Sequence, residues 1–373
     1  MRNYTEIESR QMFDRLCNGS CDTLSHLAFQ DITFYPADDC RHDCDCIFIG
    51  CQIPEQMRRV IAPDCIELPR LPVPYNIFPS MLYTPEQLYD GYNPSDEASF
   101  ENCYDTRVWH HYTSEGRIAG NILETLARSL HDHSITDALY DLLGDWDERH
   151  IVAVMGGHSL ARTDESYRKI AVISRALTQS GLLVVSGGGP GAMEATHLGA
   201  WMAGRSIEEL DAAIEILREA PRYTDKGWLA AAFRVRDLWP QTEGYRSVGV
   251  PTWFYGHEPA TPLATHIAKY FDNSIREDGL LTIAKGGVIY APGSAGTLQE
   301  IFQDAAQNHY VTHGVSSPMV FLGEEYWREQ VPVYPLLEEL MCRGRYKGLR
   351  LTITDSTDTA AETLLDFAHY SSR

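Results

Sequence analysis

The sequence predicts an α/β fold, a Rossmann-like doubly wound parallel sheet with an N-terminal accessory segment. From residue 151 onward, short apolar runs typical of buried strands alternate with longer amphipathic segments typical of helices. Two of these apolar runs lead directly into glycine-rich loops, at residues 187–191 and 292–296. Such alternation indicates right-handed βαβ units, in which ligands bind at the carboxyl ends of the strands.

The predicted elements follow one another along the chain, and we find no internal repeat. Strands are expected at residues 45–53, 151–155, 182–186, 248–255, 288–290, 319–322 and 349–354. Helices are expected at residues 167–179, 192–203, 206–220, 228–239, 262–275, 298–309, 335–343 and 359–369. The charged helix 206–220 and its successor are interpreted as an insertion spanning residues 204–247.

A change in composition suggests where the Rossmann-like domain begins. Pro, Asp, Tyr and Cys are frequent in residues 1–105, which we interpret as an accessory region, and the nucleotide-binding domain is placed at 106–373. Within it, residues 106–150 form a helical lead-in with apolar residues three and four apart. The histidines of this lead-in are interpreted as surface or cap residues; they are His110, His111, His131 and His133.

Composition limits the partners and the location. The formal charge of the 373-residue chain is 31 − 52 = −21. A surface this negative repels nucleic-acid polymers and anionic membranes, so neither is expected as a partner, whereas a small anion can still bind a local loop. The first thirteen residues lack the apolar core of an export signal, and no stretch is long enough to span a bilayer. We therefore expect a cytoplasmic protein with reduced cysteines.

A cluster of Cys40, His42, Cys44, Cys46 and Cys51 raises the question of a zinc site. Structural zinc sites usually take two closely spaced ligand pairs separated by a longer loop. Here, Cys44 and Cys46 instead alternate along a predicted strand, which is not the spacing of such a ligand pair. Buried free thiols are the preferred interpretation, and no metal is expected.

Residues 286–300 follow the pattern of a strand, a tight loop and a helix start. Small side chains let backbone N–H groups approach a ligand, and the first N–H groups of a helix attract anions, so this loop is a candidate phosphate site. Its candidate ligand-binding residues are Gly293, Ser294, Ala295, Gly296 and Thr297. A structural alternative is a capping box, because Thr297 and Glu300 have the required spacing.

Other nucleotide and cofactor motifs fit less well. The loop at 187–192 matches G-x-G-x-x-A, but the acidic residue expected about twenty positions later falls in a predicted helix, which disfavours NAD and FAD. No lysine is followed by Ser or Thr, so the loop at 293–297 suits a monophosphate rather than triphosphate cleavage. Pyridoxal phosphate on Lys285 is a remote option, since glycines follow that lysine. No cofactor is expected.

Three segments together resemble the LOG (Lonely Guy) family, which was formerly labelled as lysine decarboxylases. They are residues 155–159, residues 186–195 with Gly199 and Ala200, and residues 292–300. The resemblance covers about residues 150–370, and the two glycine-rich motifs are more specific together than either alone. It implies a phosphoribohydrolase or nucleotide 5′-monophosphate nucleosidase that forms a homodimer or a higher homo-oligomer.

The resemblance also implies site residues. The family motif P-G-G-x-G-T-x-x-E places its catalytic glutamate at Glu300, with Ser294 standing at the second glycine. The motif M-x-x-R-K places its catalytic arginine at Arg276, whereas Asn273 and Glu277 depart from it. The matching motif residues assigned to nucleotide binding outside the phosphate loop are Gly157, Ser159, Gly188, Gly189, Met193 and Glu194.

These residues suit hydrolysis of the N-glycosidic bond of a nucleoside 5′-monophosphate, giving free base and ribose 5-phosphate. Glu300 would stabilise the cationic sugar or orient water, and Arg276 would steady the base or the phosphate. An alternative for Arg276 is a cation at a helix end, facing the helix dipole. Because Ser294 and Glu277 depart from the motifs, a non-catalytic mononucleotide sensor is the alternative function.

Overall fold

The computed structural model describes residues 4–17, 25–36, 38, 45–59, 61–241, 244–256 and 258–369. Its contacts divide the chain into two compact units. The smaller comprises Met1–Leu82 and Val108–Leu142, and the larger comprises Tyr83–Arg107 and Leu143–Arg373. This division differs from the predicted boundary at residue 105, because most of the helical lead-in joins the N-terminal segment and Tyr83–Arg107 joins the Rossmann-like part.

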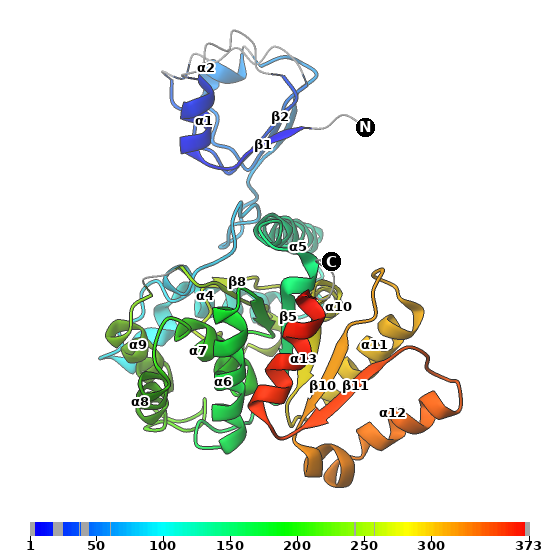
Figure 1. Ribbon diagram of the computed structural model, residues 1–373. Coiled ribbons are helices and arrows are strands. Elements are labelled where there is room, and N and C mark those ends of the chain that lie inside the picture. The colour runs from blue at the N-terminus through cyan, green and yellow to red at the C-terminus, as the bar shows by residue number, and fades with distance from the viewer. Residues whose placement is uncertain are drawn as a thin grey trace. The chain divides into compact units, whose positions relative to one another are not determined.

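The larger unit is built on a seven-stranded sheet with the order β11-β10-β9-β5-β6-β7-β8. Figure 1 labels β5, β8, β10 and β11 of this sheet. Every neighbouring pair in it is parallel. The strands are β5 Ile151–Met155, β6 Leu183–Ser186, β7 Ser247–Gly249, β8 His266–Ile267, β9 Gly287–Tyr290, β10 Pro318–Leu322 and β11 Arg350–Thr354. The predicted α/β class with a Rossmann-like parallel sheet is confirmed.

Helices connect these strands in sequence order. The longer ones are α6 Glu165–Gln179, α7 Ala192–Trp201, α8 Ile207–Leu217, α9 Trp228–Leu238, α10 Asn273–Ile283, α11 Ala295–Tyr310, α12 Val333–Cys342 and α13 Thr357–His369. Shorter segments are α3 Pro85–Leu88, η1 Glu97–Asn102, η2 Glu148–His150, η3 Trp253–Tyr255 and η4 Tyr326–Gln330, and α4 Tyr104–Glu115 joins the two units in sequence. Helix α6 packs between α7 and α13, as Figure 1 shows.

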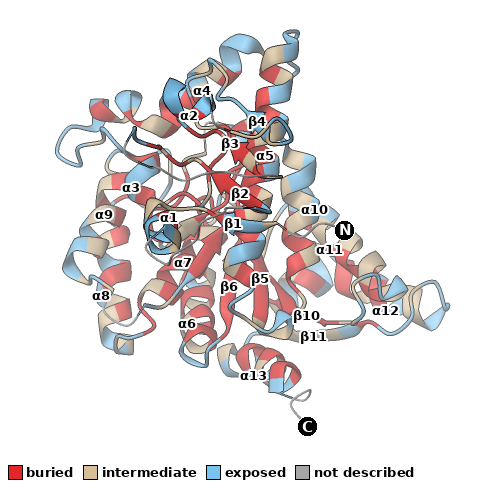
Figure 2. Ribbon diagram, turned by 90° about the horizontal axis from the view of Figure 1, so that it is seen from above, coloured by how far each residue is buried: buried red, intermediate tan, exposed pale blue. Residues whose placement is uncertain are grey.

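The centre of the sheet is buried on both faces. All residues of β5, β6, β9 and β10 are buried, and Figure 2 shows β5 and β6 in red. Parallel strands covered by helices on both sides require nearly continuous apolar runs, which is why residues 151–155 contain no polar side chain. Val152, Val184 and Ile289 pack with Ile170 and Leu198 from α6 and α7 in one core cluster.

The strand order reverses next to β5, the first strand of this sheet in the sequence. From β5 the chain passes to β6, β7 and β8 on one side, and it returns to β9, β10 and β11 on the other. The loops that follow β5 and β9 therefore leave the sheet in opposite directions at adjacent strand ends. In open α/β sheets, this switch point is where ligands bind.

Two predicted elements are wrong. Residues 262–275 are not a helix; they contain strand β8, which pairs with β7, and helix α10 begins only at Asn273. The apolar residues Leu263, Ile267 and Phe271 are four apart and buried, which imitates helical spacing in an extended segment. The strand predicted at 248–255 overlaps β7, Ser247–Gly249, in only its first two residues, and Trp253–Tyr255 form a 3-10 helix.

The smaller unit contains a four-stranded parallel sheet in the order β1-β2-β3-β4. Its elements are β1 Thr5–Ile7, α1 Arg10–Cys17, β2 Leu27–Gln30, β3 Ile47–Ile49, α2 Glu55–Arg58, β4 Ile66–Leu68 and α5 Ile122–Leu143, whose last residue belongs to the larger unit. Ala28 pairs with Ile47 and Ile47 with Ile66, each 19 residues on, whereas Glu6 pairs with Ala28, 22 residues on.

Aromatic side chains fill the core of this small sheet. Phe29 and Phe48, on neighbouring strands, stack with ring centroids 5.1 Å apart, and Phe13 and Phe34 meet Phe29 edge-on. The predicted strand at 45–53 contains β3. The other three strands were not predicted. Two of them, β1 and β4, expose most of their short length and show no clear alternation.

The predicted roles of cysteine and histidine side chains are partly corrected. Cys40, His42 and Cys44 lie outside the described residues, whereas Cys46 and Cys51 are buried. Burial raises the pKa of the free Cys51 thiol to about 11. His131 was predicted to be a surface or cap residue, but it is fully buried, and its Nδ1 lies 2.9 Å from Oδ1 of Asp132. No helix within the described ranges combines the length and apolar character needed to span a bilayer.

Candidate functional site

Three loops meet at the carboxyl edge of the large sheet. The backbone N–H of Gly157, after β5, donates to the carbonyl oxygen of Pro292, after β9, over 3.1 Å. The N–H of Ala192, at the start of α7 after β6, donates to the carbonyl oxygen of Gly157 over 3.2 Å. The loop after β5 is thus fastened to both glycine-rich loops that the sequence singled out.

The predicted phosphate loop runs into the N-terminus of α11. This helix begins at Ala295, with Ser294 as its N-cap residue, and the Ser294 side chain makes no capping hydrogen bond. The N–H groups of the first helical turn have no acceptor within the helix. Since Ser294, Ala295 and Gly296 are exposed, these groups are accessible to an anion.

The capping-box alternative for Thr297 and Glu300 is wrong. Thr297 is the third residue of α11 and Glu300 is the sixth, so neither occupies the capping position that the alternative requires. Ser294 has φ −108°, which any L-residue adopts, so the serine causes no backbone strain where the family motif has glycine.

Glycine is needed at position 293 because a Cβ atom would not fit there, not because of its backbone angles. A Cβ atom there would lie 2.1 Å from Oγ1 of Thr297 and 3.1 Å from the backbone nitrogen of Gly157. The carbonyl oxygen of Gly293 accepts a 2.5 Å hydrogen bond from the Tyr326 hydroxyl. The loop is therefore closely packed on its inner side while its outer side, at Gly296, is open.

Arg276 is the fourth residue of α10, near the helix N-terminus. The alternative that it is a cation facing the C-terminal dipole is therefore wrong, since positive charge is disfavoured at an N-terminus. Its Nε donates to the carbonyl oxygen of Val250 over 2.6 Å, and its Nη2 donates to that of Gly187 over 3.4 Å. Within the described ranges its Nη1 has no hydrogen-bond acceptor, so this group can serve a ligand.

Glu300 lies within electrostatic reach of Arg276. Burial raises the pKa of Glu300 to about 7; the positive charge of Arg276 opposes this rise, and the negative charge of Glu277 adds to it. A carboxyl group of this kind changes its protonation near neutral pH, which suits acid–base chemistry. The two predicted catalytic side chains therefore share one electrostatic environment beside the phosphate loop.

The second glycine-rich loop, residues 187–191, is supported by buried side chains whose role the sequence did not reveal. The Gly188 N–H donates to Oγ of Ser186 over 3.1 Å, and that oxygen lies 2.8 Å from Nε2 of His197. Burial lowers the pKa of His197 to about 3, so this histidine is neutral. On the other side of the loop, the Gly189 N–H donates to Sδ of Met193 over 3.4 Å.

Glu194 and the exposed Ser159 both line a cavity beside the loop after β5. The Glu194 carboxylate is fully buried and already paired, since its oxygens accept hydrogen bonds from Arg162 over 2.5 and 2.8 Å and from the Tyr167 hydroxyl over 2.9 Å. Arg162 is distant in sequence from Glu194, so no local pattern indicated this pair.

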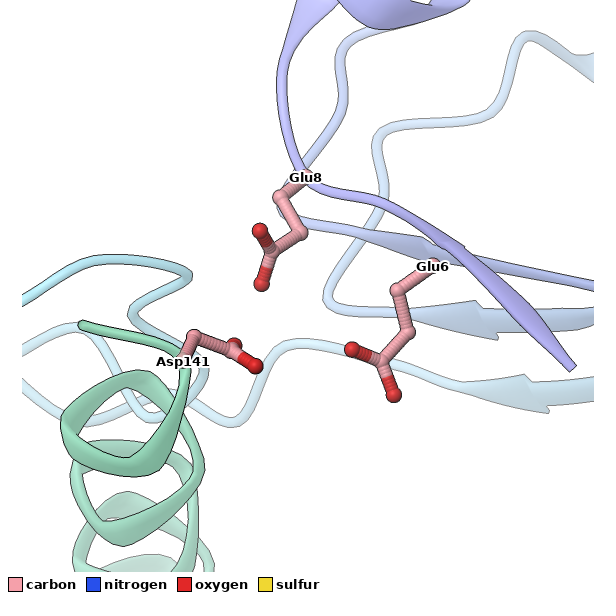
Figure 3. Close-up of side chains that lie close together, drawn as sticks. All are labelled: Glu6, Glu8 and Asp141. Carbon is pink, nitrogen blue, oxygen red and sulfur yellow. The ribbon is translucent and has the colours of Figure 1, made fainter. Parts of the chain in front are cut away.

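The smaller unit holds a separate group of carboxylates. Glu6 on β1, Glu8 just after it and Asp141 on α5 each place one oxygen within 4.8 Å of the others (Figure 3). Burial raises the pKa of Glu8 to about 7, and the charge of Asp141 adds to the rise. Neighbouring carboxylates with a raised pKa tend to share a proton, which explains their proximity without an ion.

The fold and these loops define the class of the larger unit: a Rossmann-like α/β protein with two glycine-rich loops at the switch point of its sheet. A comparison of the chain with models of known protein families gives no match, and neither does a comparison with curated proteins. The LOG-family resemblance therefore stays a prediction that rests on the motifs.

Proposed function

We propose that the protein hydrolyses the N-glycosidic bond of nucleoside 5′-monophosphates and releases a free base and ribose 5-phosphate. The observation that supports this most directly is the electrostatic interaction between Arg276 and Glu300, which lies on α11 a few residues after the exposed start of that helix. This reaction requires a phosphate-binding site, a cation and a carboxyl group that titrates near pH 7.

In the proposed reaction, the phosphate binds the N–H groups at the start of α11 and thereby fixes the ribose. The C1′–N bond breaks, and its electron pair leaves with the base as positive charge grows on the sugar. The Glu300 carboxylate stabilises that charge and takes a proton from the attacking water, whose oxygen bonds to C1′. Arg276 stabilises the negative charge that develops on the base as the bond breaks, and the proton that Glu300 took from water then passes to the base, which restores the carboxylate.

The loop also favours a single phosphate. Ser294 adds a hydroxyl donor beside the accessible N–H groups of the first turn. The chain lacks a lysine followed by Ser or Thr, which triphosphate-cleaving loops use for the β- and γ-phosphates and magnesium. We therefore propose a mononucleotide as the ligand and no cofactor.

Incubation of the purified protein with a panel of purine and pyrimidine monophosphates tests the proposal. Chromatography should detect free base and ribose 5-phosphate in equal amounts, and both should be lost with Glu300→Gln. Glu362→Gln, an exposed change on α13, serves as the control. Absence of base from every nucleotide would remove the catalytic proposal, and tight binding without release would identify the mononucleotide sensor instead.

The assembly and the location are further parts of this proposal. The family resemblance is the support for a homodimer or a higher homo-oligomer, and light scattering of the full chain measures its mass directly. A monomer at micromolar concentration would contradict this part alone. The cytoplasmic location stays a prediction from the N-terminal composition and charge of the chain.

A further inference from the structure

A cavity of about 280 Å³ opens beside the loop that follows β5. Its walls come from that loop, from the start of α7 and from the connection between α8 and α9. This connection belongs to the segment 204–247, which the sequence marked as an insertion. None of the groups used in the proposed reaction, the start of α11, Glu300 and Arg276, lines this cavity.

The buried side of the cavity is held rigid by Arg162. Its Nε and one Nη2 proton bind Glu194, its Nη1 donates to the carbonyl oxygens of Leu217 and Ala220, and its Nη2 also donates to that of Trp228. All five N–H donors are thereby used. The Arg162 guanidinium also lies 4.7 Å from the centre of the Trp228 ring. Arg162 therefore fastens the α8–α9 connection to α7 and has no donor left for a ligand.

The accessible side of the cavity is aromatic and polar. The Tyr223 ring meets the His158 ring edge-on with centroids 6.1 Å apart. Tyr223 sits in a turn that is closed twice, by the Arg222 N–H to the Asp225 carboxylate and by the Asp225 N–H to the Arg222 carbonyl oxygen, each 2.8 Å. Ser159 supplies a hydroxyl group to the lining. The turn thus presents a planar ring at a fixed position.

These features suit a planar heteroaromatic ring. Every nucleobase has a face that stacks on an aromatic side chain, and hydroxyl groups can donate to or accept from its edge. Ligand cavities for drug-sized molecules start at roughly 300 Å³. A cavity of about 280 Å³, close to that lower bound, therefore has room for a planar base.

The loop after β5 connects this cavity to the phosphate loop. Gly157 donates its N–H to Pro292, next to Gly293, and two residues later Ser159 lines the cavity. We propose that the cavity receives the base of the nucleotide, which stacks on Tyr223, while the phosphate binds at α11. This inference rests on the proposed function for the identity of the ligand as a nucleotide.

Calorimetry with AMP and with ribose 5-phosphate tests the inference. We expect Tyr223→Leu to weaken AMP binding about tenfold or more. Tyr223→Phe should keep the affinity, because the stacking face remains. The affinity for ribose 5-phosphate should stay within twofold in both variants, since it has no base. Tyr310→Leu, which removes an exposed tyrosine at the far end of α11, is the matched control.

Three results would overturn the inference: unchanged AMP affinity in Tyr223→Leu, an equal loss for AMP and ribose 5-phosphate, or no AMP binding by the unmodified protein. Thermal melting of each variant shows whether it is folded. Failure of the proposed hydrolysis is distinguishable, because the protein would then bind AMP through Tyr223 without releasing adenine.

Discussion

The Tyr290 hydroxyl donates a 2.7 Å hydrogen bond to Oδ2 of Asp304, a carboxyl group that is buried in the larger unit. Asn308 donates to the other oxygen, Oδ1, over 2.9 Å. Tyr290 ends β9 and Asp304 lies on α11, four residues after Glu300. This network therefore joins the strand before the phosphate loop to the helix after it.

The protonation of Asp304 should make stability depend on pH. Burial raises the pKa of Asp304 to about 7, although the hydrogen bond from Tyr290 opposes the rise. The folded state therefore binds more protons than the unfolded state between the unfolded pKa, near 4, and 7. The contribution of this group to the free energy of unfolding is present below pH 4 and is lost as the pH rises through 7.

Asp304→Asn tests this dependence, because an amide resembles the protonated carboxyl group in shape and hydrogen bonding. We expect the variant to lose little stability at pH 5 and to exceed the unmodified protein at pH 8 by about 1–4 kcal/mol in the free energy of unfolding. Urea unfolding at both pH values measures it, with the exposed Asp366→Asn as the control. Parallel pH profiles of the two proteins would contradict the role of Asp304.

Alanine substitutions at the two phosphate-loop glycines should affect different properties: Gly293→Ala should weaken phosphate binding, and Gly296→Ala should raise stability. Gly293→Ala would place its Cβ 2.1 Å from Thr297 Oγ1, so the loop must shift and phosphate binding should fall at least tenfold. At Gly296 a Cβ meets open space, and alanine in a helix should raise stability by about 1 kcal/mol over glycine. Calorimetry with ribose 5-phosphate and urea unfolding separate the effects. Equal loss of binding in both variants would mean that the close packing at Gly293 does not shape the site.

The pH dependence of the reaction should identify the active form of Glu300. Since the pKa of Glu300 is raised to about 7 by burial, and the proposed reaction uses the carboxylate, kcat should rise with pH and level off above 7. Glu300→Gln should lower kcat by about 10²–10⁴ and remove this titration. Rates from pH 5 to 9, measured by base release, give the profile. A rate that falls above pH 7 would show that the protonated acid is the active form.

The sequence predicts the sheet and the loops because both are local patterns. Residues 151–155 are continuously apolar, as a doubly covered parallel strand requires, and the glycine loops follow such strands directly. The start of α10 also has a local signal, since the Asp272 side chain accepts from the Ser274 N–H over 2.8 Å, but the buried spacing of Leu263 and Ile267 misled the prediction.

Contacts between distant residues were beyond sequence reasoning. His197 acts through Ser186, eleven residues away, and Arg162 binds Glu194 across thirty-two residues. In a single sequence each of these side chains looks like any other polar residue of a helix or loop. Only the folded chain brings these side chains together, so the residues that support the site were missed while its glycine-rich loops were found.

A test of the ion pair between Arg162 and Glu194 shows whether Glu194 has a structural role or binds the nucleotide. The family resemblance implies binding, yet every hydrogen bond that Glu194 accepts from Arg162 and Tyr167 lies in the core. Glu194→Gln would leave the buried Arg162 charge uncompensated and should lower the free energy of unfolding by about 3–5 kcal/mol. Urea unfolding measures this, and Glu165→Gln, an exposed change on α6, is the control.

The double variant Arg162→Met with Glu194→Leu sharpens this test, because it removes both charges together. Replacing both partners of a buried pair with apolar residues costs less than removing one, so it should be more stable than Glu194→Gln. AMP affinity, measured well below the melting temperature, should fall less in Glu194→Gln than in Tyr223→Leu, because Arg162 keeps its hydrogen bonds to the α8–α9 connection. If that variant instead keeps its stability and loses AMP affinity, Glu194 contacts the nucleotide, and the ion pair with Arg162 must open when the ligand binds.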